Sequence, residues 1–297
     1  MRKLRAVAAS ILLLAACGMA GNPSALAAAT LRDAPPRPSD EQIIALLYPD
    51  RRSEAGRLFW EPTEREIRRA KLDPIAQQFI DAQLTISVVQ VEPIVQLDLH
   101  KLLVITSAHG ESGCHACTAL AGVAILVSKG GAWHVEARNR TADVVGQYGL
   151  FPKGKLVQIG PQRYAILILA TFGNEGDYAT AATLLGQTDS GVDTLLSSEL
   201  DVVGADNEAS DDCAADDATR TRPNGEVLPR LCYRYESEFL FEPVPGRAYY
   251  ELKVHTRGTR LETERIERAA PVDEIRRFRF SKGRYRELKG DEGALTH

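Results

Sequence analysis

The sequence predicts an α+β chain that is mainly β, with antiparallel sheets preceded by short N-terminal helices. Beyond residue 83, apolar and β-branched residues alternate with polar ones, which is the pattern of half-buried strands. Turn signals recur about every 8 to 12 residues, and Lys129-Gly130-Gly131 and Ser281-Lys282-Gly283 have the chemistry of hairpin turns. Neighbouring strands should therefore pair antiparallel, in a sandwich, a barrel or a propeller-like assembly.

The first residues predict an export signal. A positively charged start is followed by an apolar run over residues 6–16, which is too short to span a bilayer as a permanent helix. The run ends at Leu14-Ala15-Ala16-Cys17, which resembles the lipobox of bacterial lipoproteins, where the cysteine thiol takes a diacylglycerol. We therefore expect residues 1–16 to be a signal peptide and Cys17 to be the lipid attachment site.

A second cleavage site competes with the lipobox. Ala25-Leu26-Ala27 fits ordinary signal peptidase, which would release a soluble periplasmic or secreted chain that begins at Ala28. The lipobox is favoured because it adjoins the apolar run directly. Since Gly18 rather than aspartate follows Cys17, the sequence resembles lipoproteins sent to the outer membrane. The expected location is the bacterial cell envelope, on the periplasm-facing side of the outer membrane.

Charge argues against one large class of partner. Loss of residues 1–16 removes three of the 36 basic residues and none of the 40 acidic ones, which leaves a formal net charge of −7. A nucleic-acid-binding protein would carry a basic footprint, so we expect no nucleic-acid partner. No second apolar run approaches about 18 residues, so we expect membrane contact through the lipid anchor only.

Residues 17–38 are predicted to be a flexible tether, because they are rich in alanine and proline and have no hydrophobic period. A helix should begin after Ser39, which is a good N-cap, and end before Pro49. Its apolar stripe consists of Ile43, Ile44 and Leu47.

Two more short helices should follow and complete a helical segment over residues 39–83 that packs on the main domain. Thr63 and Glu66 form a capping box for the first of these, which should run to about Leu72. A proline at the start of a helix favours the second, over residues 73–82.

The main β-rich domain is predicted over residues 84–289, followed by a C-terminal tail over 290–297. It contains a long acidic loop over residues 204–230, which we interpret as solvated surface. Near the end of the domain, basic residues alternate with aromatic ones. On a terminal hairpin, the basic residues would keep an exposed edge strand from pairing with another chain. The expected strands are 84–91, 95–107, 122–128, 132–137, 156–159, 164–171, 179–186, 192–203, 233–241, 248–256 and 276–288.

Four cysteines remain in the domain once Cys17 is lipidated or removed. An even number in an oxidising compartment indicates two disulfides. We prefer pairing of Cys114 with Cys117 and of Cys213 with Cys232, because each pair closes a local loop. Crosswise pairing stays open.

Reactive side chains cluster only from His109 to Cys117, and this segment has three interpretations. In the favoured one, a Cys114–Cys117 disulfide pins the loop that enters a hairpin. In a thiol-disulfide oxidoreductase, Cys114 would attack and Cys117 would resolve, but a thioredoxin-type site needs a helix directly after the motif, where strands are expected here. In a periplasmic metal-binding protein, His109 and His115 would join two thiolates, which oxidation would remove.

Other catalytic templates are absent. There is no nucleophile elbow, phosphate loop or zinc-protease motif, and Thr118 stands where a C-x-x-C-H haem motif requires histidine. We therefore assign no catalytic residue and expect no cofactor. The expected function is that of an envelope lipoprotein with a non-enzymatic binding module, whose partner is an envelope protein, a glycan or a small ligand.

The segment over about residues 95–257 resembles a group of uncharacterised exported bacterial proteins, lipoproteins among them, that carry a CHAC motif. The resemblance rests on Cys114-His115-Ala116-Cys117, Trp133, Gly146-Gln147-Tyr148-Gly149, Ile159-Gly160 and an aromatic strand after Cys232. It implies an envelope protein with a β-rich domain, and it implies neither an activity nor catalytic residues.

We expect the intact native protein to have the mass of a chain that begins at Cys17 and carries a diacylglycerol. Alkylation should add mass only after reduction, because the two predicted disulfides protect the remaining four cysteines. Mass spectrometry of the intact protein, with and without reduction, measures both. A mass that begins at Ala28 would contradict the lipid anchor, and labelling without reduction would contradict the disulfides.

Overall fold

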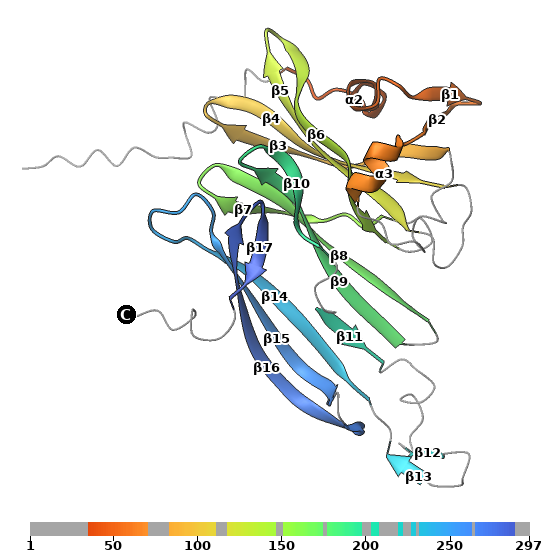
Figure 1. Cartoon of the computed structure of the whole chain (residues 1–297), viewed down its shortest axis with the longest axis vertical. Helices are drawn as coiled ribbons and strands as arrows, with labels where there is room; N and C mark the ends of the chain where they lie inside the picture. The colour runs from red at the N-terminus through yellow and green to blue at the C-terminus, as the bar shows by residue number, and fades with distance from the viewer. Residues whose placement is uncertain are drawn as a thin grey trace, which may run out of the picture. The chain divides into compact units, whose positions relative to one another are not determined.

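A computed structural model describes residues 35–70, 83–110, 118–146, 151–174, 177–197, 203–207, 219–221, 227–229, 232–262 and 265–288 (Figure 1). The chain divides into two units, Met1–Ala34 and Pro35–His297, and every described residue lies in the second. The predicted class is confirmed, because this unit consists mainly of antiparallel strands with two short helices among the described residues.

The first sheet is an antiparallel meander in the order β1-β2-β3-β4-β5-β6. Two helices, α2 (Asp40–Leu47) and α3 (Glu64–Ala70), accompany it. Its strands are β1 (Arg52–Glu54), β2 (Arg57–Trp60), β3 (Leu84–Gln96), β4 (Leu99–His109), β5 (Ala119–Lys129) and β6 (Ala132–Val145).

The second sheet has the order β17-β16-β15-β14-β11-β9-β8-β7, and β10 pairs with β9 beside this path. Each described sheet has two different end strands, so neither is closed into a barrel. The strands are β7 (Lys155–Gly160), β8 (Arg163–Asn174), β9 (Asp177–Thr188), β10 (Gly191–Leu196), β11 (Gly204–Asp206), β14 (Arg234–Glu242), β15 (Glu251–Glu262), β16 (Arg265–Ser281) and β17 (Arg284–Glu287). A separate pair consists of β12 (Thr219–Thr221) and β13 (Val227–Pro229).

The first sheet is covered on both faces, so its central strands β4 and β5 are buried along most of their length. One face packs against the apolar stripe of α2, as the sequence predicted. The other face packs against the second sheet, where Ile105 and Ile125 share a core with Ile168 and Leu185. Strand β10 of the second sheet packs against β6 of the first, which connects the two sheets (Figure 1).

The second sheet consists of two halves, β7–β10 and β14–β17. Hydrogen bonding joins them through β11, which is three residues long and pairs with β9 on one side and β14 on the other. A third core fills the space between the halves, where Leu167 and Leu184 pack with Leu252 and Phe278. Side-chain packing therefore supplements a short backbone joint.

Both described helix starts follow the predicted capping chemistry. The Ser39 hydroxyl accepts from the Gln42 N–H, and the Gln42 side chain accepts from the Ser39 N–H, which completes a capping box. The Thr63–Glu66 box that the sequence predicted is present at α3. The helix expected over 73–82 lies outside the described residues.

The N-terminal segment also contains a hairpin that the sequence did not predict. Strands β1 and β2 lie between the two helices, and β2 pairs with β3, so this segment extends the first sheet. Strands of three or four residues are too short to show an alternating pattern. The tether also ends earlier than expected, because Pro38 is buried and Trp133 Nε1 donates to the Pro36 carbonyl over 3.0 Å.

Several strand bounds differ from the expected ones. Strand β3 continues through Pro93, and the chain reverses at Leu97–Asp98, whose φ values of 51° and 60° are left-handed. Aspartate tolerates this conformation, but leucine seldom does, and no glycine or asparagine marks the turn. Strand β10 ends at Leu196, and β16 begins at Arg265. Strand β11 and the β12–β13 pair lie within the predicted acidic loop.

Arg140 on β6 attaches the N-terminal segment to the first sheet. Its guanidinium binds the Asp50 carboxylate at 2.5 Å and the Glu66 carboxylate at 2.6 Å, while only 12% of its side chain is exposed. It also lies over the rings of Trp60 and Tyr48, at 4.7 and 5.4 Å from their centres. Two carboxylates and two aromatic faces thus compensate for the loss of water around this cation.

Replacing Arg140 with alanine should lower the free energy of unfolding by about 2 kcal/mol, because Glu66 would lose its partner in a partly buried site and the guanidinium would no longer pack on the two aromatic rings. The matched control is Arg68→Ala, which removes an exposed pair with Glu64 and should cost about 0.5 kcal/mol or less. Urea unfolding measures both. Equal effects of the two substitutions would contradict the role of Arg140.

Asp50 should make this attachment sensitive to acid. Burial alone would raise the pKa of Asp50, but the hydrogen bond and charge of Arg140 outweigh it and hold the pKa below its ordinary value of 3.8. The stabilisation is therefore complete above that value and is lost as the pH falls through the lower, folded-state pKa. We expect the native chain to be more stable than Asp50→Asn at pH 7, with a difference that shrinks below about pH 4 in urea unfolding. A difference that persists at pH 2 would disagree with this account.

Candidate functional site

Two of the residues that the sequence singled out lie in the described part of the chain. His109 ends β4, is half-buried, and its Nδ1 lies 3.0 Å from the Gly110 carbonyl oxygen. Cys232 is exposed just before β14. The other predicted site residues lie outside the described part of the chain: Cys17, Cys114, His115, Cys117 and Cys213. Lipidation, the disulfide pairing and the metal-binding alternative therefore stay predictions.

The structure bears on the neighbourhood of the Cys-His-Ala-Cys motif. Strand β5 begins at Ala119, directly after Thr118, and pairs with β4 and β6. The hairpin expected after the motif is therefore confirmed, and the helix of a thioredoxin-type site does not follow the motif. Within the described ranges, histidine, cysteine and acidic side chains form no group of three or more that could hold a metal ion.

Three of the six alternating basic residues near the C-terminus, Arg276, Arg277 and Arg279, pair with glutamates. Arg276 binds Glu287 through two nitrogens, at 2.9 and 2.7 Å, which joins β16 to the edge strand β17. Arg277 lies 3.2 Å from Glu242 on β14. The expected basic hairpin is thus present, and cross-strand ion pairs account for much of its charge.

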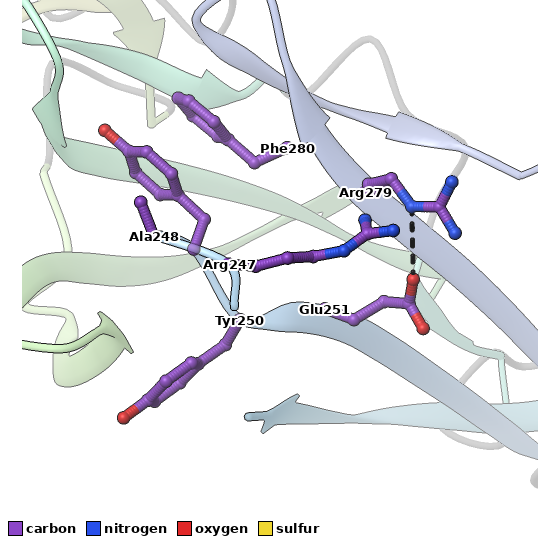
Figure 2. Close-up of a pocket in the computed structure, with 7 residues that line it drawn as sticks. Arg247, Ala248, Tyr250, Glu251, Arg279 and Phe280 are labelled. Carbon is purple, nitrogen blue, oxygen red and sulfur yellow. Dashed lines mark ion pairs between the residues drawn. The ribbon is translucent and has the colours of Figure 1, made fainter. Parts of the chain in front are cut away.

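A pocket of about 250 Å³ lies where the loop between β14 and β15 meets β16 (Figure 2). We call it the arginine–tyrosine pocket. In Figure 2, the Arg247 side chain extends between Phe280 and Tyr250 toward the Arg279–Glu251 pair. The residues that line it are Arg247, Ala248, Tyr249, Tyr250, Glu251, Arg279 and Phe280.

Aromatic packing makes one wall of this pocket rigid. Tyr249 stacks on Phe280 with ring centres 3.6 Å apart, and the Arg163 guanidinium lies 4.6 Å from the centre of the Tyr249 ring. Arg163 also donates to the Tyr249 hydroxyl over 2.9 Å, and this hydroxyl donates to Asp189 over 3.2 Å. Three loops of the second sheet therefore meet at one tyrosine.

Backbone contacts fix the loop that carries the pocket. The Tyr250 N–H donates to the Ile159 carbonyl over 2.7 Å, and the Tyr285 hydroxyl donates to the Tyr250 carbonyl over 3.1 Å. Gly160 lies so close to the Ala248 carbonyl that a side chain there would overlap it. The pocket is therefore formed before any ligand arrives.

The charges around the pocket leave a surplus of positive groups. Glu251 lies 3.5 Å from Arg279 Nε and 3.8 Å from Arg277, whose nearer partner is Glu242 at 3.2 Å. Among the described residues, Glu251 is therefore the one carboxylate that lines the pocket beside the two arginines Arg247 and Arg279. Arg279 Nε is buried without a hydrogen bond of good geometry. Arg247 is exposed, and its side chain makes no ion pair or hydrogen bond with the described residues. The site can therefore take an anionic group beside an aromatic wall.

Burial raises the pKa of the Tyr249 hydroxyl in the pocket wall, which keeps that group neutral. The described residues that line the pocket include no serine, cysteine or histidine. The sequence did not predict the pocket. Its residues come from a loop without a recognised motif and from a basic run that was interpreted as protection of an edge strand.

His255 and Asp273 form a further polar pair, 2.5 Å apart across β15 and β16. The hydrogen bond to His255 holds the pKa of Asp273 below its usual range. The Asp273 side chain is 77% exposed on an open sheet face. Ser237 bonds Thr256, whose side chain lies on the opposite face of β15, so no nucleophile adjoins this pair among the described residues.

Comparison with models of protein families, with curated proteins and with solved structures gave no match for this chain. Among the described helices, none has both the length and the apolar character needed to cross a membrane. The site must therefore be interpreted from its own chemistry.

Proposed function

We propose that this chain is a lipid-anchored envelope protein whose β-rich domain captures a protein partner through an acidic group. The observation that carries the capture step is the arginine–tyrosine pocket, where Arg247 is uncommitted and Arg279 shares its carboxylate. Support for the anchor comes from the export signal, the lipobox at Cys17 and the tether that follows. In this proposal the four remaining cysteines form structural disulfides, and no cofactor takes part.

Pocket size favours a group on a macromolecule over a free metabolite. Sites for drug-sized ligands measure about 300–1,000 Å³, and this pocket measures about 250 Å³. It therefore fits one carboxylate-bearing side chain or a chain terminus, which a neighbouring surface must help to hold.

The outer face of β14–β16 can provide that surface. Leu240 and Ile275 are 38% and 51% exposed there, on the same face as Arg279 and the charged residues around it. Apolar side chains among charged ones are typical of protein interfaces, where arginine is enriched. The acidic group would enter the pocket while the sheet face supports the rest of the partner.

The mature chain should bind an acetylated hexaglutamate peptide and should not bind hexaglutamine. Arg247→Glu should weaken this binding about tenfold, because it reverses a charge that faces the ligand. Because Arg247 has no ion pair with any described residue, folding should be unaffected. Fluorescence anisotropy of labelled peptides at low and moderate salt measures the affinity, which should fall as salt rises.

The matched control is Lys129→Glu, which makes the same change of charge at an exposed turn of the first sheet. It should leave the affinity almost unchanged. Equal weakening by both substitutions would mean a general charge effect and would overturn the assignment of the pocket. Tighter binding of trigalacturonate than of hexaglutamate would replace the protein partner with an acidic glycan.

A further inference from the structure

A second cavity lies between the two sheets and is independent of the arginine–tyrosine pocket. We call it the inter-sheet cleft. It measures about 580 Å³ and is lined by β6 of the first sheet, the β9–β10 turn and the β16–β17 turn. This volume lies within the range of about 300–1,000 Å³ in which proteins enclose a whole small molecule.

Hydrogen bonds between the sheets fix the walls of the cleft. The Asn139 side-chain amide donates to Asp193 over 2.8 Å, and the Thr194 hydroxyl donates to the Ala142 carbonyl over 2.5 Å. Asn139 and Thr194 are only 5% and 1% exposed. Because buried hydrogen bonds are costly to leave unmade, β10 is held firmly on β6. The cleft is therefore a preformed feature of the fold.

Three of the five charged residues that line the cleft have protein partners. Glu136 pairs at 2.7 Å with Lys101, whose side chain is only 5% exposed. Arg138 donates to the Leu47 carbonyl over 2.8 Å, at the negative end of the α2 dipole. Asp193 accepts from Asn139 and from the Thr194 N–H. These groups maintain the walls.

The remaining two charges are both positive. Lys282 stands in the β16–β17 turn and Arg284 begins β17, and neither side chain makes an ion pair or hydrogen bond with the described residues. Two uncommitted cations at one cleft attract an anion, and arginine can hold a phosphate or carboxylate through two nitrogens.

The rest of the lining indicates what else the ligand carries. Thr188 and Ser190 contribute hydroxyl groups, and no aromatic residue is among the described residues that line the cleft. A ring therefore has no aromatic side chain to stack on, so binding must come from charge and hydrogen bonds. We propose that the inter-sheet cleft binds a small anion that carries several hydroxyl groups, a sugar phosphate or a sugar acid.

The test is titration of the ¹⁵N-labelled mature chain with glucose 6-phosphate, glucuronate, glucose and inorganic phosphate. Glucose 6-phosphate or glucuronate should shift the amide signals of Gly191 and Gly283, which line the cleft, and leave that of Gly246, in the β14–β15 loop, unmoved. Glucose should bind at least tenfold more weakly, because it has no charge for the two cations. Shifts at Gly246 alone would overturn the proposal.

The double substitution Lys282→Gln with Arg284→Gln should raise the dissociation constant at least tenfold. Arg286→Gln is the matched control, since Arg286 is exposed on the same strand and does not line the cleft. An unchanged urea midpoint shows that the double variant is folded, as expected because neither side chain has a partner among the residues that the structure describes. Equal affinities of the native and double-substituted chains would overturn the assignment, as would binding of inorganic phosphate as tightly as of the sugar phosphate.

These outcomes are separate from those for the protein partner. The substitutions at Lys282 and Arg284 leave Arg247 and Arg279 intact, so hexaglutamate binding should persist in the double variant. Conversely, Arg247→Glu should leave sugar-phosphate binding unchanged. Either proposal can therefore fail while the other holds.

Discussion

The buried ion cluster around Arg140 is the contact on which the arrangement of the first sheet depends. The mostly buried guanidinium is stabilised there by Asp50 and Glu66, which both bind it, and by the faces of two aromatic rings. Glu66 uses its other oxygen to complete the capping box of α3, so one side chain fixes the start of a helix and its distance from β6. Tyr48, beneath the guanidinium, bonds Thr106 on β4. With the helical segment held over one face of the sheet, the other face is available for the second sheet.

Both candidate sites combine strand residues with hairpin turns and loops that the strands hold in place. The β9–β10 turn contributes to each of them: Asp189 accepts from Tyr249, which lines the arginine–tyrosine pocket, and Ser190 lines the inter-sheet cleft. The loops can carry polar and charged groups because the apolar residues of the strands already bury enough surface to hold the fold.

Features with a local cause could be predicted from the sequence, whereas those that depend on distant contacts could not. The capping residues Ser39 and Thr63 act within one helical turn, and their signals were correct. The turn at Leu97–Asp98 has only a weak local signal, because a left-handed leucine is tolerated only where the pairing of β3 with β4 imposes it. The arginine–tyrosine pocket could not be predicted for the same reason. The sequence shows that basic residues alternate near the C-terminus, but which arginines have glutamate partners depends on the register of β14, β15 and β16.

Strand β11 gives the second sheet a joint whose strength varies with temperature. Because Gly204–Asp206 provides few backbone hydrogen bonds, the attraction between the two halves comes chiefly from the apolar side chains around Leu252 and Phe278. Hydrophobic attraction weakens on cooling. The halves of the larger sheet are therefore held less firmly in the cold, whereas the ion cluster at Arg140 gives the smaller sheet a contact that does not depend on apolar burial alone.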